Sequence, residues 1–159
     1  MKLKVLSIYL LLAGYLLLQS ACREIALYER LVNIPGGAWQ SDRIVELPIE
    51  IADTALDYNI YATIRHTSMY AYRNIWIRMG IRQPNADSTT YQDFELPLAT
   101  NEQWLGTGMN DVYERRVRLF GVPVRFSQAG QAVFTLQQIM RDDPLPGVLQ
   151  VGIRIEPVP

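Results

Sequence analysis

The sequence predicts an all-β protein: a single domain folded as a two-sheet antiparallel sandwich of jelly-roll or related Greek-key type. Apolar residues recur at every second position of several short segments, as in a strand with one buried face, and not at the period of about 3.6 residues that marks a helix. Proline, glycine, asparagine and aspartate separate these segments, as turn residues do. Short strands joined by such turns favour a sandwich, and a barrel is the alternative.

The alternating segments define the expected strands. In residues 45–51, valine, leucine and isoleucine alternate with glutamate and proline, and later segments repeat this pattern. Pro48 and Pro97 fall inside two of the strands, and proline has no N–H to donate to a ladder. We therefore expect those strands at sheet edges, or those residues facing solvent. The expected strands cover residues 45–51, 58–64, 75–81, 94–98, 115–120, 122–126, 131–137 and 149–156.

The chain divides into three parts. Residues 1–21 have the features of a signal peptide, and residues 37–159 hold all the expected strands. Between them, residues 22–36 lack a clear alternation and end in an Ile-Pro-Gly-Gly turn. We therefore expect residues 22–36 to form a tether and entry loop ahead of the β-sandwich.

The N-terminus carries an export signal. Lys2 and Lys4 precede an apolar run over residues 5–18, and the small residues Ser20 and Ala21 follow it. The run is shorter than the roughly 20 apolar residues that span a bilayer. The sequence thus predicts export to an extracytoplasmic location with cleavage of the signal.

Cys22 is the only cysteine, and it stands directly after the signal. A single cysteine can form neither an intramolecular disulfide nor a cysteine-based metal site. The order small-small-Cys resembles the lipobox of bacterial lipoproteins, although Gln19 stands where an aliphatic residue is usual. We predict that Cys22 carries a covalent lipid, and two or more acyl chains would hold the domain on a membrane. The alternative is cleavage nearby, which leaves a free thiol.

The charge balance excludes one class of partner. Both lysines lie in the signal, so the rest of the chain carries thirteen arginines against sixteen acidic residues. These charges are dispersed, apart from Arg115, Arg116 and Arg118. Nucleic-acid binding needs a clustered basic surface, so we expect no nucleic-acid partner.

The candidate catalytic and metal-binding residues are few. His66 is the only histidine, no Gly-x-Ser-x-Gly motif is present, and His66 is expected in a turn or on the surface. Asp142 and Asp143, with Asp111 or Glu102, have the oxygen ligands of a calcium site or hydrolytic pair, but their spacing matches no metal loop. We expect a solvated turn there, no metal, no other cofactor and no enzymatic activity.

The segment from Trp104 to Asp111 contains Gly106-Thr107-Gly108. A dinucleotide-binding loop needs a third glycine between a strand and a helix, and this segment has neither feature. The two glycines are therefore expected to set backbone conformations that a side chain would forbid.

Aromatic residues suggest a second kind of function. Trp76 and Tyr61 fall on the polar sides of their expected strands, and Tyr70 and Tyr72 lie between those strands. A coplanar, exposed set of such rings would make a glycan-binding platform, so a surface glycan-binding lipoprotein is the alternative function. The competing interpretation is that the rings cover a sheet face.

An ordered series of short motifs runs along the chain. Its most specific parts are Trp104-Leu105-Gly106-Thr107-Gly108 and Met140-Arg141. The series resembles the gliding motility lipoprotein GldH family of Bacteroidota over nearly the whole chain. The other residues that carry it are Tyr28, Trp39, residues 59–61, Ile64-Arg65, residues 70–76, Gly130, Phe134, Gln138, Leu145, Gly147 and residues 151–156.

The resemblance implies a non-enzymatic lipoprotein of the cell envelope, in the inner or the outer membrane. It implies a role in gliding motility and type IX protein secretion through contacts with other envelope proteins. It brings no catalytic residues. Trp76, Trp104, Gly106, Gly108 and Arg141 are the expected pattern or partner-binding positions, and Cys22 is the expected lipidation site.

Overall fold

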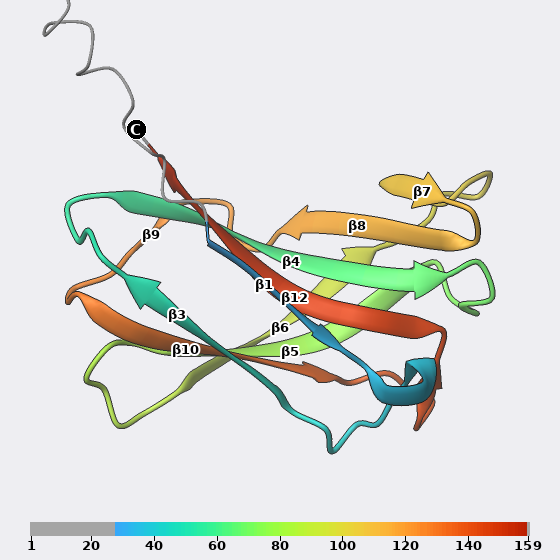
Figure 1. Ribbon diagram of the computed structural model, residues 1–159, viewed down its shortest axis with the longest axis horizontal. Helices are drawn as coiled ribbons and strands as arrows, with labels where there is room; N and C mark the ends of the chain where they lie inside the picture. Colours follow the sequence, from blue (N-terminus) through green and yellow to red (C-terminus); the bar gives the residue numbers. More distant parts are fainter. Residues whose placement is uncertain (1–27, 159) are drawn as a thin grey trace, which may run out of the picture.

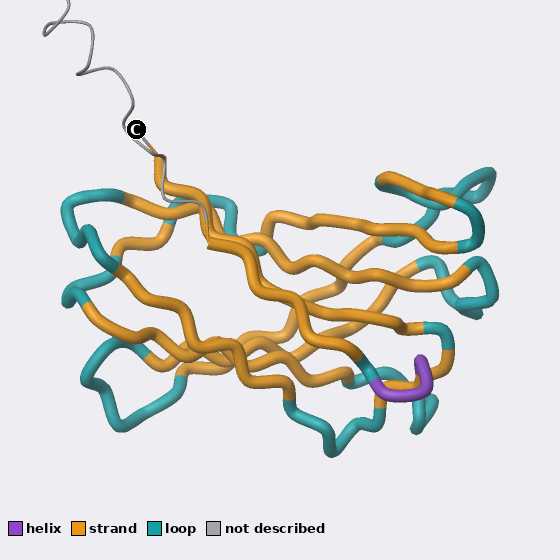
Figure 2. The backbone as a smooth tube through the Cα atoms, viewed as in Figure 1, coloured by secondary structure: helices purple, strands orange, loops and turns teal. Residues whose placement is uncertain are grey.

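The computed structural model describes residues 28–158, which form two main antiparallel β-sheets packed face to face and a small third sheet (Figure 1). A 3-10 helix, η2 (Pro35–Gly37), is the one helical element among these residues, as Figure 2 shows. The all-β sandwich expected from the sequence is confirmed.

The larger sheet has six strands, and the smaller sheets have four and two. In sheet order, the six-stranded sheet contains β1 (Tyr28–Asn33), β12 (Val148–Val158), β4 (Asp57–Thr67), β8 (Val112–Arg118) and β7 (Thr107–Met109), with β9 (Val124–Arg125) paired to β4. The four-stranded sheet contains β3 (Val45–Ile51), β10 (Gly130–Gln138), β5 (Asn74–Arg82) and β6 (Thr90–Pro97). The short β2 (Ala38–Trp39) pairs with β11 (Leu145–Pro146).

The strand pairing is that of a jelly roll. The first half of the chain pairs with the second half in reverse order: β1 with β12, β3 with β10, β4 with β8, and β5 with β6. This long nested hairpin then wraps on itself, so that β12 also pairs with β4, and β10 with β5. The wrapping places β1, β3, β4 and β5 alternately in the two main sheets and encloses one core.

The core lies between the two main sheets and follows the expected alternation. Every second residue of β4, from Tyr58 to Ile64, is buried against inward residues of β5 and β10 such as Ile77 and Phe134. Fully burying one such side chain contributes about 1.5–3 kcal/mol. The opposite phase of each strand carries polar residues and faces outward.

Two expectations about edges and boundaries have different outcomes. β3 and β6, which contain Pro48 and Pro97, are indeed the edge strands of their sheet. The expectation of a tether through residues 22–36 is wrong for its second half, because Tyr28–Asn33 forms β1. An edge strand exposes much of both faces, and β1 therefore lacks the alternation that reveals a strand. Cys22 and the signal peptide lie outside the described residues.

Short strands were also missed. β2, β7 and β11 contain two or three residues each, too few to show a period. No helix among residues 28–158 has the length and apolar character needed to cross a membrane.

A candidate partner-binding end of the sandwich

The structure gathers the expected pattern residues at one end of the sandwich. This end is formed by the connections 68–73, 98–106 and 139–144, and we call it the Trp104 end. It lies at the right of Figure 1, beside η2 and β7. Trp76 is the third residue of β5 there, Gly106 precedes β7, Gly108 lies within β7, and Arg141 follows β10. β1 begins at the opposite end, which we call the Tyr28 end.

Trp104 is partly buried at this end and packs against three other aromatic rings. Its ring centroid lies 4.6 Å from that of His66, 5.8 Å from Tyr113 and 6.4 Å from Tyr70. A β-bridge from Trp104 to Ala99 holds its backbone in place. Trp104 therefore fixes the connection 98–106 against the end of the core.

The two glycines of the Gly-x-Gly segment allow close backbone and ring packing. Gly106 has φ +91°, and a Cβ atom there would lie 2.1 Å from the carbonyl oxygen of Glu114. Gly108 has an ordinary φ, but a Cβ atom would lie 2.8 Å from the Tyr113 ring. The expected backbone role is thus confirmed for Gly106, whereas Gly108 makes room for a side chain.

The expectation that His66 lies in a turn or on the surface is wrong. His66 is fully buried in β4, where it continues the inward phase of Ile60 and Ile64. Its Nδ1 lies 3.0 Å from the carbonyl oxygen of Thr67, so Nδ1 carries the proton and donates it to that bond. Burial lowers the pKa of His66, and Nε2 is buried with no hydrogen-bond partner. Both observations describe a neutral imidazole packed into the core.

The carboxylates of Asp142 and Asp143 accept hydrogen bonds that link their loop to other loops. Tyr72 donates a 2.7 Å hydrogen bond to Asp142 Oδ2. Asp143 accepts bonds from the backbone N–H and the hydroxyl of Ser41, at 2.8 and 2.5 Å, and these bonds lower the pKa of Asp143. The two carboxylates bond to different loops. Residues 28–158 contain no group of three or more side chains arranged to hold a metal ion.

A surface groove opens between the connections 68–73 and 98–106. One part has a volume of about 450 Å³, and an adjoining part of about 330 Å³ shares four lining residues with it. Arg73 lines both parts, and its guanidinium donates a hydrogen bond to Asn101. Glu95 lines one wall and accepts a 2.5 Å bond from Asn74. We call this feature the Arg73 groove, and its polar, open walls fit a peptide chain better than an apolar small molecule.

Trp76 and Arg141 lie close to each other at this end. The backbone N–H of Trp76 donates to Met140 Sδ at 3.1 Å, and its carbonyl oxygen accepts from the Ile139 N–H at 3.0 Å. Trp76 is 41% exposed, and Arg141, which follows Met140 in the sequence, is also exposed. The exposure expected of Trp76 is confirmed, and tryptophan and arginine are both enriched at protein interfaces.

The coplanar aromatic platform expected for a glycan-binding protein is absent from residues 28–158. Tyr70 is 3% exposed and donates from its hydroxyl to the Asn74 carbonyl oxygen, so burial has removed it from the surface. Tyr61 lies on the outer face of the six-stranded sheet, whereas Trp76 lies on the outer face of the four-stranded sheet. The rings therefore cannot stack on one sugar chain.

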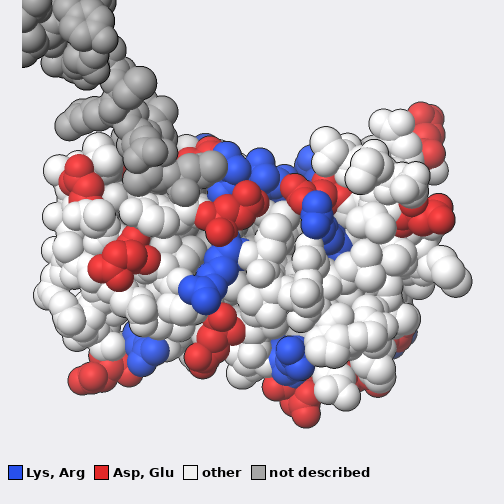
Figure 3. Space-filling model, viewed as in Figure 1, with Lys and Arg blue, Asp and Glu red and all other residues white. Residues whose placement is uncertain are grey.

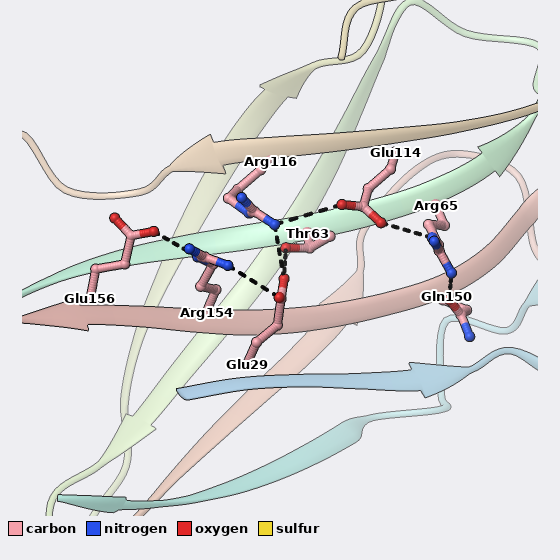
Figure 4. Close-up of polar contacts among 8 residues, drawn as sticks. All are labelled: Glu29, Thr63, Arg65, Glu114, Arg116, Gln150, Arg154 and Glu156. Atoms are coloured by element: carbon pink, nitrogen blue, oxygen red, sulfur yellow. Dashed lines mark hydrogen bonds and ion pairs between the residues drawn. The ribbon is translucent and has the colours of Figure 1, made fainter. Parts of the chain in front are cut away.

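A network of ion pairs, which sequence reasoning missed, covers the outer face of the six-stranded sheet (Figure 4). Glu29 accepts from Arg116 at 3.2 Å and from Arg154 at 3.3 Å. Arg65 donates to Glu114 at 2.8 Å, and Arg154 donates to Glu156 at 2.6 Å. Residues of four neighbouring strands contribute to the network, and only the strand register reveals that they meet.

Positive and negative residues are intermixed on the face seen in Figure 3. The network contains three arginines and three glutamates, so it presents no single sign of charge to a ligand. Exposed ion pairs contribute about 0–1 kcal/mol each. This network therefore serves mainly to fix the outer side chains of β1, β12, β4 and β8.

Two comparisons with known proteins bear on the family of this chain. The family model described as GldH lipoprotein matches residues 26–155. The chain is also 28% identical over 151 residues to the gliding motility lipoprotein GldH homolog of Christiangramia forsetii, covering 89% of this chain and 90% of that protein. The match includes both main sheets and the whole Trp104 end, and the chain belongs to the GldH lipoprotein family.

Proposed function

We propose that this protein is a lipid-anchored, non-enzymatic component of the cell envelope that supports gliding motility and type IX protein secretion by binding other proteins. The observation that carries the proposal is the family match over residues 26–155, with a lone cysteine just ahead of it at Cys22. The lipid on Cys22 is the anchor, and the β-sandwich is the extracytoplasmic binding domain.

The length of chain between Cys22 and β1 sets the orientation of the domain. Tyr28 lies six positions after Cys22, and an extended chain spans at most about 3.6 Å per residue, so the tether reaches roughly 20 Å. This short tether keeps the Tyr28 end near the membrane. The Trp104 end is then presented away from it, where a partner protein can reach it.

The chemistry of the Trp104 end supports binding rather than catalysis. His66 is neutral and buried, and Asp142 and Asp143 are engaged by Tyr72 and Ser41. The exposed features are the Arg73 groove and the residues Trp76 and Arg141. These features offer hydrogen-bonding groups, a cation and an aromatic ring to a protein surface.

The experiment that tests this function is deletion of the gene, followed by complementation with the wild type or with Cys22→Ala. We expect deletion to abolish surface spreading and type IX secretion, and the wild type to restore both. Cys22→Ala should yield a folded domain that leaves the membrane fraction and restores neither. Spreading and secretion that stay intact after deletion would refute the proposal.

Gln19→Leu is the matched control for the anchor. It places an aliphatic residue three positions before the cysteine, as the usual lipobox has, and we expect it to stay membrane-bound and functional. A Cys22→Ala protein that restores both phenotypes would show that lipid attachment is not needed.

A further inference from the structure

The jelly roll is closed along one side and open along the other. On the closed side β1 lies beside β3, and Arg30 donates a 3.1 Å hydrogen bond to the Pro48 carbonyl oxygen. On the open side β6 is the last strand of its sheet, and no strand within residues 28–158 pairs with its outer edge. Phe94 packs against Phe120 at 5.4 Å there, which covers the core beneath the edge. The edge itself remains accessible.

The hydrogen-bond register of β5 and β6 identifies the groups that face outward. The Leu98 N–H donates to the Arg73 carbonyl oxygen at 2.8 Å, directly beyond the last register pair of Asn74 with Pro97. Bonded and non-bonded pairs alternate in an antiparallel ladder, so Leu96 bonds to β5 and Glu95 does not.

The same alternation extends along the strand. Gln92 and Phe94 bond to β5, whereas Tyr91 and Asp93 direct their backbone N–H and C=O groups away from it. Pro97 falls on the outward phase, where its missing N–H removes no ladder bond. Three consecutive outward positions, 91, 93 and 95, therefore offer free donors and acceptors.

We propose that the outer edge of β6 binds an extended segment of a partner protein, which adds a strand to the four-stranded sheet. Main-chain hydrogen bonds to residues 91, 93 and 95 supply the affinity, as in other cases of strand addition. The inference deepens the proposed function, on which it rests, by locating the partner and stating its chemistry.

The side chains along the edge define that chemistry. Tyr91 is 60% exposed, and Asp93 and Glu95 are exposed on the same outer face. Arg78 pairs with Asp93 at 2.7 Å, but no arginine within residues 28–158 pairs with Glu95. Opposite charges on neighbouring strands are favourable, so the partner segment carries a basic residue beside Glu95.

A second copy of this chain fits the edge poorly. If two β6 strands paired antiparallel about a twofold axis near Phe94, the acidic residues Asp93 and Glu95 of one copy would face those of the other, and like charges across a strand pair are destabilising. The charge of the edge therefore favours a different protein over a homodimer.

The Arg73 groove continues this edge. Glu95 and Pro97 of β6 line the groove together with Arg73 and Ala99. A segment paired with β6 would end near Pro97, because Trp104 and Leu105 already pair with Ala99 and Leu98 beyond it. The side chains at the end of such a segment would lie next to the groove at Glu95 and Pro97.

The test is photocrosslinking in cells with the full-length protein, using p-benzoylphenylalanine in place of Tyr91. Glu95→Pro removes one outward N–H and one charge, whereas Glu95→Arg keeps the N–H and reverses the charge. Glu50→Pro and Glu50→Arg are the matched controls, since Glu50 is also an exposed glutamate in an edge strand, two residues from a native proline. Western blots of adduct mass and of total protein give the yield for each variant.

We expect an adduct of defined mass with the wild type, a loss of about tenfold or more with either Glu95 variant, and wild-type yield with either Glu50 control. Glu95→Arg keeps the result interpretable if Glu95→Pro accumulates poorly. The absence of any adduct at position 91, or equal yields for the Glu95 and Glu50 variants, would overturn the strand-addition site. Because gene deletion tests gliding and secretion separately, a failure here is distinguishable from a failure of the proposed function.

Discussion

The hydroxyl of Tyr72 donates a 2.7 Å hydrogen bond to the carboxylate of Asp142, two residues that lie 70 positions apart in the sequence. The bond joins the connection after β4 to the connection after β10. It also raises the pKa of Tyr72, because ionising the hydroxyl would remove the donor and place two negative charges together. Tyr72 lines the Arg73 groove, so this bond fixes one of its walls.

Tyr72→Phe should lower the melting temperature by a few degrees and weaken partner binding at the Trp104 end. The substitution removes the donor to Asp142 but retains the ring, so the loss reports the hydrogen bond alone. Tyr91→Phe is the control, because Tyr91 is exposed and its hydroxyl has no hydrogen-bond partner within residues 28–158. Equal melting temperatures for both variants, measured by circular dichroism, would contradict the prediction.

Gly106→Ala should destabilise the domain by about 2 kcal/mol or more. The new methyl group would lie 2.1 Å from the Glu114 carbonyl oxygen, and φ +91° is strained for any residue with a side chain. Gly121→Ala is the control, because nothing lies within 4 Å of its Cβ position and its φ is ordinary. We expect the control to change the free energy of unfolding by less than about 1 kcal/mol in urea titrations.

Sequence alone could predict the elements that bury one face. Residues 45–51 show a clean alternation, and the expected strand coincides with β3 (Val45–Ile51). The sequence pattern did not predict β1, because both faces of this edge strand meet solvent. The strand forms by pairing with β12, more than 100 residues away. Local pattern carries no information about such distant pairing.

In the candidate site too, some features follow from the local sequence pattern and others do not. The exposure of Trp76 follows from its phase in the strand, and the same argument would have placed His66 inside, in phase with Ile64. The usual exposure of histidine outweighed the pattern there. The Arg73 groove lies between connections about 25 residues apart, so its existence depends on the pairing of β5 with β6, which brings Arg73 beside Leu98 and Ala99.

Acidification from pH 7 to pH 5 should destabilise the domain through His66. Its pKa is lowered from 6.5 by burial, so the unfolded chain binds more protons than the folded one as pH falls through 6.5, and stability is lost in that direction. The pKa values of Asp93 and Asp143 are lowered from 3.8, so their stabilisation is lost only below about pH 3.8. Between pH 7 and pH 5, the change in the free energy of unfolding is thus expected to come from His66.

His66→Phe is the variant that checks this assignment. It preserves aromatic packing against Trp104 and Tyr113, while it removes the titrating group. Urea titrations at the two pH values should show a smaller pH dependence for the variant than for the wild type. An unchanged dependence would assign the effect to other groups.

Backbone amides along β6 should exchange with solvent in an alternating pattern. The N–H groups of Gln92, Phe94 and Leu96 bond to β5 and should be protected, whereas those of Tyr91 and Glu95 face the free edge and should exchange fast. Amide exchange of the purified domain, followed by NMR, measures each position.

The exchange pattern tests the register directly, before any partner is known. If positions 91, 93 and 95 are protected in the isolated domain, another part of the protein already pairs with the edge, and no strand can be added there. If they exchange fast alone and become protected when a basic peptide is added, the main-chain groups of β6 are the binding groups. The Glu50 amide in β3 provides the comparison, since the β3 edge lies beside β1 and its exchange should not respond to the peptide.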